Sequence, residues 1–162
     1  MDKKLHSALN EQIKNELYSA YLYLSMASWF ESVNLEGFAH WMKVQAKEEE
    51  KHAMKIFDFL NDRGVKVVLQ AIAQPPVDFS SAKEIFEQSL GHEKKVTAMI
   101  NKLYDLSLDV GDHASRVFLH WFINEQVEEE KSPSKILETL RAIKGEGAAL
   151  IMLDRELAKR EG

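Results

Sequence analysis

The chain lacks cysteine and has only three prolines and seven glycines. Without thiols, disulfides, iron-sulfur clusters and thiolate zinc sites are excluded, so carboxylate, imidazole or amide groups must hold any metal ion. No apolar run reaches the roughly 18 residues that a membrane span needs, and the first six residues lack the apolar stretch of a secretory signal. These absences predict a cytoplasmic protein with no membrane partner.

Basic charge is also scarce. Lys and Arg total 21 against 26 Asp and Glu, which gives a net charge of -5 and a pI near 5.7. Nucleic-acid binding requires a basic face that neutralises phosphates, and none is evident, so we expect cations rather than nucleic acid as ligands. The 162 residues with 45% hydrophobic content predict a single domain, residues 1–162, with a core of its own.

Helical periodicity dominates, and the few glycines and prolines separate long segments. Asn34, Gly64 and Gly111 are placed to end helices, and Ser80 or Ser81 to begin one. The predicted helices are Lys4 to Val33, Leu35 to Arg63, Ser81 to Val110, His113 to Ile143, and the short Ala148 to Lys159. We therefore predict an all-α protein.

The segment from Gly64 to Ser80 differs from its surroundings. Val65, Val67 and Leu69 alternate with other residues, and Pro75-Pro76 follow, which indicates an extended connection. Extended, it reaches roughly 55 Å, enough to return along helices about 45 Å long. The other turns are tight. The sequence thus predicts a four-helix bundle in which the long crossover makes helices two and three parallel, followed by a short fifth helix.

Glutamates interrupt the apolar faces of these helices. Glu48–Glu50 and Glu128–Glu130 are runs of three, and three helical residues sweep roughly 200°, so at least one carboxylate of each run faces the core. A buried carboxylate must be paired, protonated or bound to a metal ion. For Glu50 and Glu130 a solvated position is the simpler interpretation.

Each of the four long helices places one glutamate near its midpoint on its own apolar stripe. These residues are Glu16, Glu49, Glu93 and Glu129. His52 follows Glu49 by three residues, so both can reach one metal ion. A single glutamate or histidine of this kind is usually a boundary or core residue, but four at one level would repel one another unless two divalent cations compensated them. We predict a dinuclear metal site, with Tyr23 and Gln126 nearby.

Several stretches resemble the non-haem ferritins of the prokaryotic type. They are Asn10-Glu11-Gln12, Glu16-Leu17-Tyr18-Ser19, Gly37-Phe38-Ala39-His40-Trp41-Met42, Gln45-Ala46-Lys47-Glu48-Glu49 with His52-Ala53, and Glu125-Gln126-Val127-Glu128-Glu129-Glu130. Ferritin-like di-iron proteins are a known bundle architecture, with Glu from two helices and Glu-x-x-His from two others. The resemblance covers essentially the whole chain.

The resemblance implies a ferroxidase that oxidises Fe(II) with dioxygen or peroxide and stores the ferric product in a 24-subunit cage. It assigns the first iron to Glu16, Glu49 and His52, and the second to Glu49, Glu93 and Glu129. Gln126 stands where the symmetric pattern has a charged ligand, so the second iron should be held more weakly.

The resemblance also implies a third, transit iron site on the flank of the centre. Its ligands would be Glu48, Glu125 and Glu128. Tyr23 would hydrogen-bond the centre or supply an electron, although a role as a core aromatic is an equally good interpretation. Haem is not expected, because Glu50 stands where haem-binding relatives carry methionine. Trp41 and Trp121 are assigned to packing, with Trp121 close to the site.

Two alternative functions remain at this point. A rubrerythrin-like bundle would remove peroxide without storage, but that class normally adds a cysteine cluster, which this chain lacks. A DNA-protecting mini-ferritin would hold its metal ligands between subunits, whereas here they fall within one bundle.

Pro133 lies inside the fourth predicted helix and would free the carbonyl of Glu129. We expect a kink that leaves Glu129 able to bind metal. A helix that restarts at Pro133, with Ser132 as its cap, is the alternative.

Overall fold

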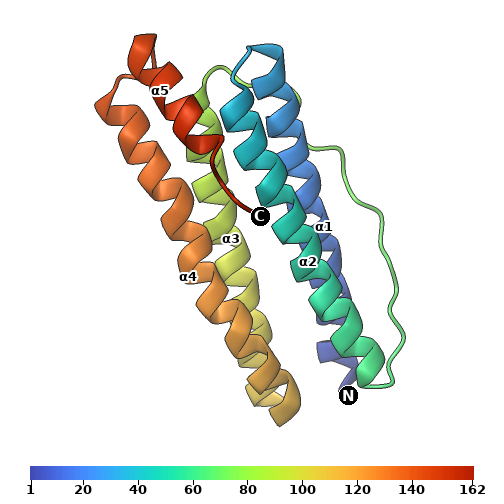
Figure 1. Ribbon diagram of the computed structural model, residues 1–162. Helices are drawn as coiled ribbons and strands as arrows, with labels where there is room; N and C mark the ends of the chain where they lie inside the picture. The colour runs from blue at the N-terminus through green and yellow to red at the C-terminus, as the bar shows by residue number, and fades with distance from the viewer.

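The computed structural model describes residues 1–162 and is entirely helical (Figure 1). The helices are α1 (Lys3–Ser32), α2 (Glu36–Asp62), α3 (Ala82–Asp109), α4 (His113–Ala142) and α5 (Gly147–Leu157). The predicted fold class is confirmed, and each predicted helix end lies within a few residues of the observed one. None of the five helices has a stretch long and apolar enough to cross a membrane.

The four long helices form two antiparallel pairs, α1 with α2 and α3 with α4 (Figure 1). The chain from Arg63 to Ser81 runs back along the bundle, so α2 and α3 point the same way. This is the predicted crossover. The short α5 lies across the end of the bundle at which α2 begins and α4 ends.

The crossover is held against α1 by side chains at three levels. The Nε2 atom of His6 is 2.7 Å from the Lys66 carbonyl, Asn10 Oδ1 accepts from the amide of Val68 at 2.8 Å, and Ser25 Oγ donates to the Pro76 carbonyl at 2.5 Å. These bonds satisfy backbone groups that have no strand partner. The connection is therefore an ordered strap.

The α5 helix packs tightly on the first turn of α2. A Cβ atom on Gly37 would lie only 1.7 Å from the Asp154 carbonyl oxygen, so only glycine fits there. Asp154 Oδ1 accepts from the amide of Phe38 at 2.9 Å. Leu35 cannot cap α2 with its side chain, so a residue of α5 supplies the missing acceptor.

Apolar side chains form two separate clusters, one toward each end of the bundle. The cluster at the α5 end includes Met26, Phe30 and Phe86, and the other includes Leu9, Ile56 and Ile100. Between them lies a layer of buried polar side chains. Its members are Glu16, Ser19, Gln45, Glu49, His52, Glu93, Gln126 and Glu129.

The apolar stripe of α1 differs from the expected one in its second half. From the sequence, the apolar stripe of the first helix is expected to run through Leu5, Leu9, Ile13, Leu17, Ala20, Leu24 and Ala27. In the structure Leu24 is 49% exposed, whereas Met26 is fully buried. The stripe passes through Glu16 and Tyr23, because the helix turns by 3.6 residues and a strict spacing of four drifts off the buried face. Polar residues thus continue the buried face.

Helix α4 continues through Pro133, and the alternative of a helix restarting there is wrong. Pro133 is buried, and Glu129, whose carbonyl the proline deprives of its partner, keeps its side chain only 5% exposed. The proline therefore does not turn Glu129 to solvent.

Candidate metal centre

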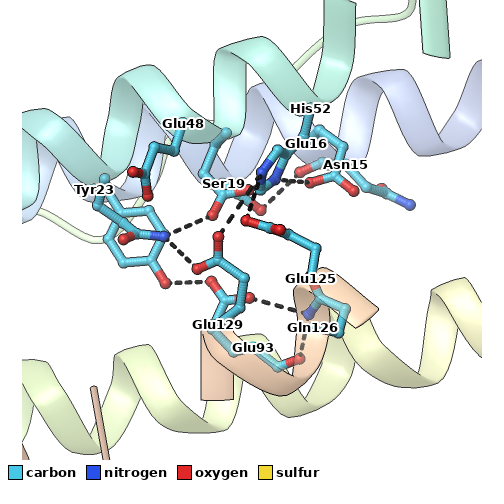
Figure 2. Close-up of polar contacts among 12 residues, drawn as sticks. Asn15, Glu16, Ser19, Tyr23, Glu48, His52, Glu93, Glu125, Gln126 and Glu129 are labelled. Carbon is cyan, nitrogen blue, oxygen red and sulfur yellow. Dashed lines mark hydrogen bonds and ion pairs between the residues drawn. The ribbon is translucent and has the colours of Figure 1, made fainter. Parts of the chain in front are cut away.

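The buried polar layer contains overlapping groups of donors that could each hold a metal ion. In each group the donor atoms lie within 4.8 Å of one another. The groups are Glu16, Glu49 and His52, then Glu49, Glu93 and Glu129, and then His52, Glu125 and Glu129. The structure thus brings together the five residues predicted for a dinuclear site, and Glu49 belongs to two of the groups (Figure 2).

The first group joins α1 and α2. His52 Nδ1 is 3.2 Å from Glu49 Oε2 and 4.0 Å from Glu16 Oε2. Each carboxylate also accepts from an amide one turn earlier on its own helix, Glu16 from Gln12 Nε2 at 2.9 Å and Glu49 from Gln45 Nε2 at 3.0 Å. Residues four apart share a helix face, so both glutamines orient the carboxylates locally.

The second group is oriented across the bundle (Figure 2). The Tyr23 hydroxyl donates to Glu93 Oε1 at 2.5 Å, and Gln126 Nε2 donates to Glu93 Oε2 at 3.2 Å. Gln45 Nε2 donates to Glu129 Oε2 at 2.6 Å. Tyr23 and Gln126 thus lie in the site as predicted, as donors to one carboxylate.

Burial dominates the electrostatics of the centre. It raises the pKa of Glu16 to about 8 and that of Glu129 to about 8, with the neighbouring carboxylates adding to the effect. Burial likewise raises the pKa of Glu93 to about 7 and that of Glu49 well above its usual range. Without a metal ion, these groups therefore keep their protons to a higher pH than an exposed carboxyl group does. A bound cation would supply the compensation that the layer lacks.

One buried carboxylate oxygen has no donor directed at it. With the carboxylates ionised, Glu16 Oε2 is the only buried side-chain polar atom of the chain without a hydrogen bond, and it lies 4.0 Å from His52 Nδ1. Leaving such an atom unsatisfied is unfavourable. Carboxylate oxygens with one imidazole are donors that suit iron and similar divalent ions, so this group fits a metal ion.

A polar pocket of about 180 Å³ adjoins the centre on one flank, between α2, α4 and the C-terminal residues. Glu48, Glu125 and Glu128, the three residues predicted for a transit site, all line it. Only Glu125 belongs to a donor group, and its Oε1 lies 3.8 Å from His52 Nε2. The carboxylate of Glu48 binds Arg160, and that of Glu128 is exposed beside Lys131.

The remaining residues of the two glutamate runs differ from each other. Glu50 is exposed, as expected. Glu130 is half-buried and accepts from Thr97 Oγ1 of α3 at 2.8 Å, so the expectation of a solvated side chain is wrong for this residue. Trp41 is packed in the core, whereas Trp121 is 38% exposed and its ring centroid lies 5.4 Å from that of His52.

The sequence interpretation assigned no role in the site to Gln12, Gln45 or Arg160. The two glutamines had a detectable signal, an amide four residues before a stripe carboxylate. Arg160 had none, because it reaches the site from the far end of the chain, where Nη2 binds Gln45 Oε1 at 2.9 Å and Glu48 Oε2 at 2.8 Å.

A helical bundle with a carboxylate and histidine layer at its middle defines a ferritin-like protein. The family described as a ferritin-like domain matches residues 6–143, and the chain belongs to this family. Among its relatives, a bacterial non-heme ferritin of Staphylococcus saprophyticus is 41% identical over 99% of the chain and 96% of its own length. The corresponding protein of Staphylococcus epidermidis is 39% identical with the same coverage.

Solved structures give the same assignment. A structure described as a novel open pore ferritin from the hyperthermophilic archaeon Archaeoglobus fulgidus is 47% identical, with a TM-score of 0.98 over 99% of this chain and 98% of that chain. A humanized archaeal ferritin is 46% identical with a TM-score of 0.99 over 100% and 99%. The prediction of a non-haem ferritin that stores iron is confirmed, and the rubrerythrin-like alternative is not favoured.

Proposed function

We propose that the chain oxidises Fe(II) to Fe(III) at the buried centre before the iron is stored. The observation that supports this most directly is Glu16 Oε2, which receives no hydrogen bond, lies 4.0 Å from His52 Nδ1, and belongs to a residue that forms one donor group with Glu49 and His52. Glu16, Glu49 and His52 would bind one Fe(II), and Glu49, Glu93 and Glu129 the other. Both iron ions are substrates here, and the ferric product leaves for storage.

The carboxylates favour this reaction because hard oxygen donors bind Fe(III) better than Fe(II). Two adjacent Fe(II) ions each give one electron, so together they reduce dioxygen to hydrogen peroxide, or peroxide to water, with uptake of two protons. Glu49, shared between both groups, would keep the two ions adjacent. Whether dioxygen or peroxide is the native oxidant would follow from the products.

The second iron should be held more loosely than the first. Gln126 brings a neutral amide to Glu93 where the symmetric pattern has a charged ligand. In addition, the second group contains carboxylates alone and no imidazole nitrogen of its own. Tyr23 donates to Glu93 and would keep that carboxylate oriented during turnover. Its position beside the centre also suits a one-electron donor.

A third iron would pass through the flank pocket. His52, Glu125 and Glu129 form a donor group beside Glu48 and Glu128, on the side where the centre opens to the surface. Iron leaving the second site could move there through Glu129, which both groups share. We further propose that each subunit is a single domain, that the subunits assemble into a cytoplasmic 24-subunit cage, and that no haem is bound.

The centre is tested by measuring Fe(II) oxidation in two variants, each of which lacks a ligand of one of the two iron positions. His52→Ala should abolish binding at the first position, and Glu129→Ala at the second, and either change should slow oxidation about a hundredfold because two ions are needed. His120→Ala is the control, since His120 is an exposed histidine of α4 whose imidazole lies beside Tyr104, away from the donor groups. Oxidation at the wild-type rate in both variants would refute the assignment.

The cage is tested by light scattering of the purified protein. Twenty-four subunits of 18.6 kDa give a particle of about 450 kDa. A stable monomer or dimer at micromolar concentration would contradict the cage while leaving the oxidation chemistry in place.

A further inference from the structure

Arg160, two residues before the last residue of the chain, places a positive charge in the acidic flank pocket. Its Nη2 atom lies 2.8 Å from Glu48 Oε2 and 2.9 Å from Gln45 Oε1, and its Nη1 atom donates to the Trp41 carbonyl at 3.1 Å. The guanidinium also covers the Trp41 ring, 4.2 Å from its centroid. Four independent contacts therefore fix this cation.

The position is unusual because Arg160 is the one basic side chain among the residues that line the pocket. Glu128 also lies beside Lys131, whereas Arg160 is the only basic side chain that pairs with Glu48. The side chain of Arg160 is only 18% exposed, and that of Glu48 is 33% exposed. Charge that is partly withdrawn from water interacts more strongly than surface charge. Arg160 thus fills the electrostatic role that a bound metal ion would fill in the same pocket.

The arginine is also connected to the centre. Gln45 accepts from Arg160 through Oε1, which leaves its Nε2 free to donate to Glu49 at 3.0 Å and to Glu129 at 2.6 Å. An amide whose oxygen is engaged cannot turn over without losing all three bonds. Arg160 therefore orients, through one glutamine, two carboxylates of the centre.

We propose that Arg160 is a tethered cation that competes with the transit metal ion for the flank pocket, and that an ion entering the pocket displaces it and loosens the C-terminal tail. This inference rests on the transit site of the proposed function. Glu48 cannot give its full charge to both cations, so metal binding and arginine binding oppose each other. The mobility of the C-terminal tail would then depend on whether a metal ion occupies the flank pocket.

The tail is suited to such a change because few other polar contacts hold it. Its amides make single-turn bonds, Lys159 to the Glu156 carbonyl and Arg160 to the Leu157 carbonyl. The Arg160 carbonyl lies 2.7 Å from His40 Nε2. Loss of the guanidinium contacts would remove most of the polar attachment to α2 and speed amide exchange in this segment.

The first experiment is titration with Zn²⁺, which binds without being oxidised, followed by calorimetry. Wild-type protein should bind two ions tightly and a third more weakly. Arg160→Gln should bind the third ion about tenfold more tightly, because the competing charge is gone. Lys159→Gln is the matched control, since Lys159 loses the same charge next in sequence but pairs only with the exposed Glu156.

The second experiment needs no variant. Exchange of the amides of residues 158–160, which are hydrogen-bonded, should stay unchanged while the first two zinc ions bind and should rise several-fold with the third. A third ion that binds equally well to wild type and Arg160→Gln, or tail exchange that does not respond to it, would overturn the inference while two tight ions remain. Wild-type protein that binds no zinc tightly would instead refute the metal centre and the inference with it.

Discussion

The two halves of the metal centre differ in where their supporting hydrogen bonds originate. In the first half, Glu16 and Glu49 accept from Gln12 and Gln45, each one turn earlier on the same helix. In the second half, Glu93 accepts from Tyr23 of α1 and from Gln126 of α4. The carboxylates of the first half are supported within their own helices, whereas Glu93 and Glu129, which the first half lacks, are supported from other helices.

This difference has consequences for how firmly each half holds its ligands. A donor on the same helix keeps its position whenever that helix is formed, whereas a donor from another helix depends on how α1, α3 and α4 pack. The second half should therefore respond more to changes in packing. It also carries no imidazole of its own, so it is the half from which iron should leave first.

The largest expected effect concerns the stability of the metal-free protein as a function of pH. Burial raises the pKa of Glu16 to about 8 and of Glu93 to about 7, from 4.5 in the unfolded chain. Between pH 4.5 and 8 the folded state thus holds more protons, so its stability falls as pH rises. Guanidinium unfolding should show a decrease on the order of several kcal/mol across this window.

Two variants divide this pH dependence between the halves. Glu93→Gln should flatten the curve mainly below pH 7, and Glu16→Gln should also flatten it up to about pH 8. Glu50→Gln, a change at an exposed neighbour, is the control and should leave the curve unchanged. A free energy of unfolding independent of pH in the wild type would show that the carboxylates are not desolvated as described.

Loss of the carboxylate of Glu49, which both halves share, should affect both halves of the centre. Glu49 belongs to both principal donor groups, so Glu49→Ala should weaken both ions and slow Fe(II) oxidation about a hundredfold. Stopped-flow absorbance of the ferric product measures the rate. Glu50→Ala, the exposed next residue, should retain the wild-type rate, and a Glu49→Ala rate within tenfold of wild type would contradict a shared ligand.

Substitution of Gln12 and Gln45 tests whether each hydrogen bond to a carboxylate supports only one half of the centre. Gln12→Ala should lower zinc affinity about tenfold at one position only, because Gln12 contacts only Glu16 among the ligands. Gln45→Ala should weaken both positions, since Gln45 donates to Glu49 and Glu129. Calorimetry separates the two binding events, with Gln88→Ala, whose amide bonds Glu84, as the control. If Gln12→Ala and Gln45→Ala changed the two zinc affinities in the same way, the difference in support between the two halves would be contradicted.

The smallest effect is expected for Tyr23→Phe. The change removes the hydroxyl that donates to Glu93, a bond of about 1 kcal/mol, so the second ion should bind a few-fold more weakly and the first should not change. Tyr18→Phe on the same helix controls for loss of a hydroxyl away from the ligands. If Tyr23→Phe instead weakened binding of the first ion, the assignment of Tyr23 to the second half of the centre would be wrong.

The same distinction explains which features the sequence could predict. The periodicity of each helix predicted the four mid-helix carboxylates and His52, because their burial depends on spacing within one helix. It did not predict that Glu130 bonds Thr97 or that Arg160 reaches Gln45, because these contacts join elements distant in the chain.

The long strap between α2 and α3 is the only covalent link between the two helical hairpins (Figure 1). Ions bound by Glu49 on one side and by Glu93 and Glu129 on the other would join the hairpins a second time. They would close a loop of the chain in the way that a disulfide does, and restrict the unfolded chain accordingly. In a protein without cysteine, the bound iron ions would thus form a reversible cross-link between the hairpins, present when iron is abundant and absent when it is scarce.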